Sequence, residues 1–237
     1  MSGSKAIQYP PQNGAYAVKV KNGAGWTKFG IARFHISVGQ AYHEDEKFRA
    51  TMAWASHRFE KVIICVNDTL QRHNYIFDGI VEIEAFNLAE ADGREWIERN
   101  LQSIRQLPNF EINRWEEWRV DPDYVRRQAE INELYQSDRS FRETIDNEVL
   151  TFWQRRQKRM GLADEYRFAD FQKNSTNYLL EECAVFSMMF EKDNAVDIYP
   201  GSVLLPCILF KNEDALGSRA FTRIDFSRNK FLVHEMA

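Results

Sequence analysis

The run KVIICVN at residues 61–67 constrains the fold more than any other stretch of this chain. Five apolar residues stand in a row, which is short for a helix, and several of them are β-branched. An unbroken apolar run of this length is typical of a strand that is buried on both faces, as strands of parallel sheets are. We therefore expect a layered structure in which other elements cover this strand from both sides.

The preceding segments supply a second strand and a connecting helix. Residues 28–38 (KFGIARFHISV) read as a strand, and residues 43–58 (HEDEKFRATMAWASHR) carry acidic side chains first and basic ones last. This order of charges suits the dipole of a helix. A strand, a helix and a strand in this order predict the α/β class, with a central, mostly parallel sheet flanked by helices.

Further elements are predicted along the chain by the same criteria. The expected strands are 15–20, 196–199, 203–210 and 219–225. One helix is expected to begin just after Asn67, and another to cover 89–106. Two more helices are expected within 122–160, with a break near Ser137 and Asp138, and a last one over the apolar segment 178–190. The chain has 237 residues and no internal repeat or linker. We expect one domain over 15–237, preceded by a flexible segment at 1–14.

The composition argues against several classes of protein. The net charge of −4 does not suggest a nucleic-acid-binding protein, because phosphate binding depends on lysine and arginine, and only a local basic patch would change this expectation. Cys65, Cys183 and Cys207 have neither the spacing nor the neighbouring histidines of a zinc site. No apolar segment has the length of a membrane span, and the amino terminus does not resemble a signal peptide. We expect a cytoplasmic protein without a metal centre.

Ser37 is a candidate nucleophile, because it stands where a predicted strand ends. The sequence HISVG at 35–39 differs from the hydrolase motif G-x-S-x-G only at its first position. A triad hydrolase is disfavoured, because the oxyanion loop has little room before Ser37 and the sole late histidine, His234, is close to the chain end. ATP-dependent activation of an amino acid is disfavoured as well, because the chain lacks the ATP-binding motifs that aminoacyl-tRNA synthetases carry. A serine esterase stays open as an alternative.

The strand that ends at Ser37 places further polar side chains beside it. Side chains alternate along a strand, so Arg33, His35 and Ser37 share one face, which leads to the edge of the sheet where ligands bind. Cys65 and Asn67 share a face of the neighbouring strand in the same way. The alternative for Arg33 and His35 is that their strand lies at the edge of the sheet with one wet face.

A second polar cluster lies in the apolar segment 178–190. Tyr178 and Glu182 are four residues apart and therefore roughly 40° apart on one helix face. A carboxylate among apolar neighbours needs a cation, which is either an arginine of the protein or an ammonium group of a substrate. Tyr199 precedes Pro200 and Gly201, and this pair fixes a turn that could aim the Tyr199 hydroxyl.

These features occur together in one known family. The pieces are Ser37 after an apolar strand, YHEDEKF at 42–48, DTLQRHN at 68–74, RWEEW at 114–118, YLLEE at 178–182 and the pair Tyr199-Pro200. From about residue 28 to the carboxyl terminus the chain resembles the cyclodipeptide synthases, and Gln40 with Tyr199-Pro200 resembles their Tyr-Pro subgroup. The resemblance implies a Rossmann-like domain related to the catalytic domains of tyrosyl- and tryptophanyl-tRNA synthetases, without their ATP chemistry and without a cofactor.

The resemblance also implies roles for individual residues. Two aminoacyl-tRNAs would be consumed in sequence, and Ser37 would carry the first aminoacyl group as an ester. Glu182, with Tyr178, would hold the ammonium group and accept a proton, and Tyr199 would position the dipeptidyl ester or relay its proton as the ring closes. The predicted substrate-binding residues are Arg33, His35, Gln40, Cys65, Asn67 and Pro200. A pocket lined by Arg33 and His35 would favour an acidic first aminoacyl group, unless Arg33 pairs internally.

Two basic patches are candidates for contact with tRNA. The first holds Arg155, Arg156, Lys158 and Arg159, and the second holds Arg94 and Arg105, which lie roughly 20° apart around one helix. The alternative is that these are ordinary solvated surfaces. A relative that binds aminoacyl-tRNA without catalysis is also an alternative to a synthase. We expect a monomer that contacts neither DNA nor a membrane.

Overall fold

The computed structural model describes residues 15–22, 26–160, 167–192, 194–201 and 221–228. The predicted flexible segment 1–14 and the predicted strand 203–210 lie outside the described residues.

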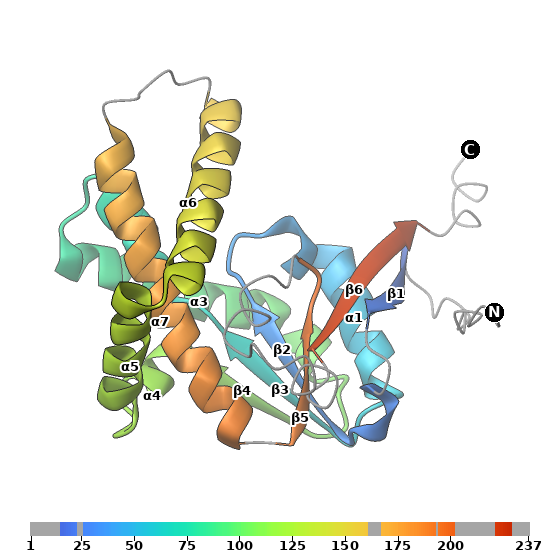
Figure 1. Ribbon diagram of the computed structural model, residues 1–237. Coiled ribbons are helices and arrows are strands. Elements are labelled where there is room, and N and C mark those ends of the chain that lie inside the picture. Colours follow the sequence, from blue (N-terminus) through green and yellow to red (C-terminus); the bar gives the residue numbers. More distant parts are fainter. Residues whose placement is uncertain (1–14, 23–25, 161–166, 193, 202–220, 229–237) are drawn as a thin grey trace, which may run out of the picture.

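A six-stranded sheet forms the centre of the molecule (Figure 1). Its strands are β1 (Tyr16–Asn22), β2 (Ile31–Ile36), β3 (Lys61–Val66), β4 (Phe110–Arg114), β5 (Ala195–Tyr199) and β6 (Phe221–Arg228), in the spatial order β1-β6-β5-β2-β3-β4. The pairs β6-β5, β5-β2, β2-β3 and β3-β4 are parallel, and only β1 runs antiparallel to its neighbour. The predicted mostly parallel sheet is confirmed.

The placement of β2 corrects one of the sequence-based alternatives. This strand lies between β5 and β3, so it is an interior strand. Arg33 and His35 are accordingly buried, with exposed fractions of 0% and 1%. The interpretation in which they occupy the wet face of an edge strand is wrong. Two charged or polar side chains on a central strand need partners within the protein or in a ligand.

Seven α-helices surround the sheet within the described residues. They are α1 (Asp45–Ser56), α2 (Arg72–Phe77), α3 (Glu82–Ile104), α4 (Trp115–Arg119), α5 (Tyr124–Ser137), α6 (Arg139–Met160) and α7 (Phe168–Lys192), with short 3-10 helices at Trp26–Lys28, Ala41–His43 and Thr69–Gln71. The predicted break near Ser137 is confirmed. The Asp138 carboxylate accepts a hydrogen bond from the backbone N–H of Phe141 at 2.9 Å, which caps the new helix.

The two faces of the sheet are covered by different helices. Phe34 and Ile36 of β2 pack in one core with Phe48 of α1 and Trp96 of α3. On the other face, Ile63 and Cys65 of β3 pack with α4 and with the carboxyl-terminal half of α7, which contributes Val185, Phe186, Met188, Met189 and Phe190. β3 is thus buried on both faces, as its unbroken apolar run predicts.

The amino-terminal half of α7 packs in a helical bundle instead. It meets α2, α5 and α6 around a third core, in which Phe141, Ile145 and Val149 of α6 recur at helical spacing. Figure 1 shows α6 and this half of α7 side by side, reaching beyond the sheet. Tyr178 and Glu182 therefore lie in the stretch of α7 that joins the bundle to the sheet.

Candidate active site

A cavity of about 980 Å³ opens between the sheet and the bundle. Its walls come from the ends of β2, β3 and β5, from the 3-10 helix Ala41–His43 and from α6 and α7. The predicted site residues in its lining are His35, Ser37, Gln40, Asn67, Arg155, Arg156, Lys158, Tyr178, Glu182 and Tyr199. Residues from both ends of the sequence thus meet in one hollow at the carboxyl ends of parallel strands, where α/β sheets bind ligands.

Ser37 directly follows β2 and is hydrogen-bonded to a tyrosine from another strand. Gly39 adopts a φ of +82°, a conformation that favours glycine, and the backbone N–H of Gln40 donates to the carbonyl of Ser37 at 3.2 Å. This turn ends the strand and leaves the serine hydroxyl on the cavity wall. Ser37 Oγ lies 3.1 Å from Tyr199 Oη. The structure thus brings Ser37 and Tyr199, both predicted site residues, within hydrogen-bond distance of each other.

Glu182 is an acid without a partner in the cavity. It is half-buried and makes no hydrogen bond or ion pair with any other residue of the described ranges. Burial, and after it repulsion by Glu148, raises the pKa of Glu182 to about 8. Two cations could balance this carboxylate. An arginine partner is absent within the described part of the chain, so the ammonium group of a substrate is the explanation that stays open.

Tyr178 lies one helical turn before Glu182 and lines the same cavity. Its hydroxyl accepts a hydrogen bond from Gln71 Nε2 at 3.2 Å. Burial, and then the charge of Glu182, raises the pKa of Tyr178, so this hydroxyl stays protonated and can donate. Gln71 belongs to the DTLQRHN stretch, so this hydrogen bond joins that stretch to Tyr178.

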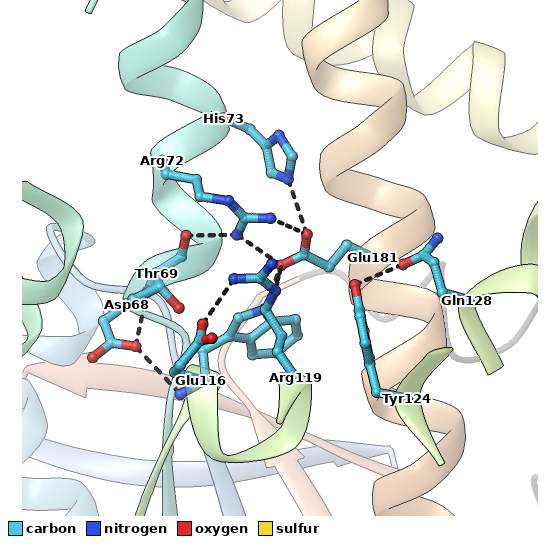
Figure 2. Close-up of polar contacts among 10 residues, drawn as sticks. Asp68, Thr69, Arg72, His73, Glu116, Arg119, Tyr124, Gln128 and Glu181 are labelled. Atoms are coloured by element: carbon cyan, nitrogen blue, oxygen red, sulfur yellow. Dashed lines mark hydrogen bonds and ion pairs between the residues drawn. The ribbon is translucent and has the colours of Figure 1, made fainter. Parts of the chain in front are cut away.

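The neighbouring acid, Glu181, points from α7 toward Arg72 and His73 of α2 and is hydrogen-bonded there (Figure 2). Its oxygens accept two hydrogen bonds from the Arg72 guanidinium, one from His73 Nε2 at 3.2 Å and one from Trp115 Nε1 at 2.8 Å. Arg119 Nε lies 3.6 Å from Glu181 Oε1. This network joins the segments DTLQRHN, RWEEW and YLLEE, whose nearness in space the sequence does not reveal.

The Glu181 network is expected to contribute to stability. Burial alone would raise the pKa of Glu181, but His73 and Arg72 together lower it to about 2. Because this carboxylate is ionised more easily in the folded chain, its contribution is full above about pH 4.5 and is lost as the pH falls through about 2.

Replacing Glu181 with glutamine should lower the free energy of unfolding by about 3 kcal/mol at pH 7, because buried Arg72 loses its counter-charge. Urea unfolding measures this change. Glu111→Gln is the matched control: its pair with Lys61 is exposed, and it should cost less than about 1 kcal/mol. Equal losses for the two variants would contradict the proposed importance of the network.

Arg33 and His35 share a buried acid that sequence reasoning missed. Asp197 lies directly opposite Arg33 in the parallel pairing of β2 with β5. It accepts hydrogen bonds from Arg33 Nη1 at 3.0 Å and from His35 Nε2 at 2.8 Å. Burial, as the main cause, lowers the pKa of His35, so the ring is neutral at pH 7. Arg33 therefore pairs internally, and the charge on which an acidic substrate preference rested is already matched.

Some predicted site residues lie away from the cavity. Arg33 and Cys65 are buried beneath its wall, and Pro200 is not in the lining, although its neighbours Tyr199 and Gly201 are. Arg94 and Arg105 are exposed at α3, outside the cavity. The side chain of Arg159 lies outside the described part of the structure. The cavity also contains Tyr42, Gln71, Asn74 and Glu148, which sequence reasoning did not assign.

No group of three or more histidine, cysteine, aspartate or glutamate side chains within the described ranges is placed to hold a metal ion. Of the described helices, none combines the length and the apolar character that crossing a membrane requires.

Comparison with known proteins places the chain in a sequence family. The family model described as cyclodipeptide synthase matches residues 28–221, most of the chain. A search of curated proteins found no match. Among solved structures, a cyclodipeptide synthase from Fluoribacter dumoffii is 26% identical, with a TM-score of 0.81 over 90% of this chain and 100% of that one.

Two more distant structures share the fold. A Mycobacterium tuberculosis protein, described as showing that cyclodipeptide synthetases are related to type I tRNA synthetases, is 16% identical with a TM-score of 0.65, covering 96% of this chain and 99% of that one. A cyclodipeptide synthase from Candidatus Glomeribacter gigasporarum, solved with Phe-tRNAPhe bound, is 19% identical with a TM-score of 0.62, covering 84% and 87%. At these identities the likeness establishes a common Rossmann-like architecture.

Proposed function

Since the chain belongs to the cyclodipeptide synthase family, we propose that it joins two aminoacyl groups through an aminoacyl ester of Ser37. The enzyme makes cyclic dipeptides from aminoacyl-tRNAs. The proposal concerns the steps that its own residues carry out. One observation carries the proposal. Ser37, with its partner Tyr199, lines the same cavity as Glu182, an acid that has no partner within the described ranges, and basic side chains of α6 line it too.

The first step is the transfer of an aminoacyl group from tRNA to Ser37. An aminoacyl-tRNA is an ester and is already activated, so a serine can exchange with it without the strong base that amide cleavage requires. This accounts for a nucleophile whose side chain is hydrogen-bonded to a tyrosine, Tyr199. The ribose oxygen of the tRNA leaves, and the enzyme keeps an aminoacyl ester with a free amino group.

The second step forms the amide bond and needs a base. The amino group of the Ser37 ester loses a proton and attacks the carbonyl carbon of the second aminoacyl-tRNA, whose ribose oxygen leaves with a proton, so that a dipeptidyl ester stays on Ser37. An α-amino group has a pKa of about 8, and the pKa of Glu182 is raised to about 8 as well. Proton transfer between the two is therefore nearly balanced, which favours general base catalysis. Before that step the carboxylate would hold the ammonium group of the first aminoacyl ester, with the Tyr178 hydroxyl as a second contact. Tyr199 would position the dipeptidyl ester for ring closure.

The tRNA is expected to approach along α6. Arg155 and Lys158 are exposed, and they line the cavity with half-buried Arg156. Arg156 is fixed by an ion pair with Asp78 and by its position over the Phe77 ring. Positive side chains beside the cavity would bind phosphates of the acceptor end without reading its sequence. The second patch, Arg94 and Arg105, stays a prediction for more distant tRNA contacts.

Synthesis with purified components tests this function. The protein is incubated with a mixture of aminoacyl-tRNAs, and the products are identified by mass spectrometry. A diketopiperazine, together with one aminoacyl mass on the peptide that contains Ser37, is the expected result. Release of free amino acids alone would indicate an esterase, and unchanged aminoacyl-tRNA would indicate a binding protein. The same experiment identifies the two amino acids.

The rate of product formation is expected to rise with pH up to about pH 8, because Glu182 must be ionised to accept a proton. Glu148→Gln removes the negative charge that helps to raise the pKa of Glu182, so the inflection should move to lower pH. The rate at pH 7 should then rise about twofold. A pH–rate profile of the amide-forming step measures both effects. An inflection that moves to higher pH would contradict the assignment of Glu182 as the base.

Other expectations from the sequence stay predictions. These are the sequential use of two aminoacyl-tRNAs in a ping-pong cycle, the Tyr-Pro subgroup, a monomeric state, a cytoplasmic location and the limits of the domain. The roles of His35, Gln40 and Asn67 in substrate binding also belong here, and they are supported by the position of these side chains in the cavity wall.

A further inference from the structure

A third hydroxyl group lies next to the two that the proposed mechanism uses. Tyr42 Oη is 2.7 Å from Tyr199 Oη, which in turn is 3.1 Å from Ser37 Oγ. Tyr42 also lines the cavity. The three oxygens thus form a chain that begins at the nucleophile and ends at a tyrosine of the cavity wall.

The position of Tyr42 is fixed by its neighbours. It lies in the 3-10 helix Ala41–His43, and its ring meets the rings of Tyr199 and His43 edge-on, with centroids 5.8 and 4.6 Å away. His43 is buried, and its carbonyl oxygen accepts a hydrogen bond from Trp96 Nε1 at 3.0 Å. A hydroxyl that is held in place before the reaction needs little reorganisation during it.

We infer, on the basis of the proposed function, that Tyr42 is a relay residue that delivers the serine's proton to the leaving ribose oxygen. Ser37 Oγ forms a bond to the ester carbonyl carbon, and the bond from that carbon to the ribose oxygen breaks. Tyr199 takes the proton of Ser37 and passes its own to Tyr42, which gives its proton to the ribose oxygen. Each tyrosine gains one proton and loses one, so the products are the Ser37 ester and a free tRNA hydroxyl.

The groups around Tyr42 suit this role. Burial is the main cause that raises the pKa of Tyr42, and the charge of Glu182 adds to it, whereas Tyr199 and Arg155 act in the opposite direction. Burial likewise raises the pKa of Tyr199. Both phenols keep their protons at neutral pH, so they can relay a proton only by giving one while taking another. Burial also lowers the pKa of His43 to about 3, so this ring does not compete for the proton.

The direction of the chain agrees with the proposed approach of tRNA. Tyr42, at the end of the chain of hydroxyl groups, lines the same cavity as the basic side chains Arg155, Arg156 and Lys158 of α6. The leaving ribose belongs to the tRNA that α6 would hold. The competing route is direct transfer of the serine's proton through the vicinal hydroxyl of that ribose, which would leave Tyr42 without a part in the chemistry.

Comparison of two leaving groups tests the inference. Tyr42→Phe keeps the ring but removes the last hydroxyl of the chain. Acylation of Ser37 by aminoacyl-tRNA, measured in a single turnover by rapid quench, should slow about 100-fold. Acylation by the p-nitrophenyl ester of the same amino acid should change little, because a phenolate leaves without receiving a proton. This second reaction also shows whether the variant has kept an intact site.

The control is Tyr135→Phe, which removes a hydroxyl bonded to Asp146 at 2.7 Å and lying outside the cavity lining. It should acylate at the wild-type rate with both esters. An undiminished rate of Tyr42→Phe with aminoacyl-tRNA would overturn the inference, and so would an equal loss with both esters, which would make Tyr42 a positioning residue only. An absence of acylation in the wild-type protein would overturn the proposed function itself, so the two failures are distinguishable.

Discussion

Ser37→Ala is expected to reduce cyclic dipeptide formation by about 1,000-fold or more, because the variant has no oxygen that can carry the first aminoacyl group. The amino acids would have to meet without a covalent intermediate, in a cavity large enough for both. The measurement is the initial rate of diketopiperazine formation from purified aminoacyl-tRNA. Intact-protein mass spectrometry should show one added aminoacyl group on the wild type and none on the variant.

The control for this substitution is Ser56→Ala at the end of α1. Ser56 Oγ donates to the carbonyl of Ala53 at 2.9 Å, and the residue does not line the cavity. It should form product at the wild-type rate. A Ser37→Ala protein that forms cyclic dipeptide as fast as the wild type would show that the acyl group is carried elsewhere or not at all, and the mechanism proposed above would have to be abandoned.

Glu182→Gln is expected to lower product formation by about 100- to 1,000-fold, because the amide cannot accept the proton of the attacking amino group. It should act on a different step from Ser37→Ala. The Ser37 ester is expected to form and to persist, while the dipeptide does not appear. The rise of the rate up to about pH 8 should also disappear from the residual activity. Quenched-flow analysis of the ester and of the product separates the two steps.

The adjacent acid provides a matched comparison for this variant. Glu181→Gln breaks a buried ion pair and should destabilise the fold, whereas Glu182→Gln removes a carboxylate that has no partner within the described ranges and should leave the free energy of unfolding unchanged or higher. Urea unfolding of both variants tests this contrast. If Glu182→Gln makes cyclic dipeptide at the wild-type rate, Glu182 is not the base, whatever the free energy of unfolding of this variant.

The distinction between these two acids illustrates how far sequence reasoning reached. The spacing of Tyr178 and Glu182 predicts a shared helix face, and both side chains do line the cavity. The spacing says nothing about Glu181, whose partners come from α2 and α4. The motif that contains Arg72 can be identified in the sequence. The role of Arg72 as the counter-charge of Glu181 depends on contacts between distant segments.

Strand β4 shows a limit of a different kind. Its sequence, FEINR, has a polar side chain at most positions and lies at an edge of the sheet, with its first two residues exposed. An edge strand needs neither the apolar run nor the strict alternation that identifies interior strands, so periodicity could not reveal it. The same reasoning explains why β3, which is buried on both faces, was the clearest prediction in the chain.

Local patterns in the sequence were enough to predict the fold class, the strand-helix-strand unit from β2 to β3, the break before α6 and the residues at the end of β2, because periodicity, capping and charge order act over short distances along the chain. Only the tertiary structure decided that β2 is interior, that Asp197 neutralises Arg33 and that Tyr42 and Tyr199 meet at Ser37. These facts depend on which strands become neighbours across the sheet. That choice is made by packing between residues more than 150 positions apart, and no local pattern records it.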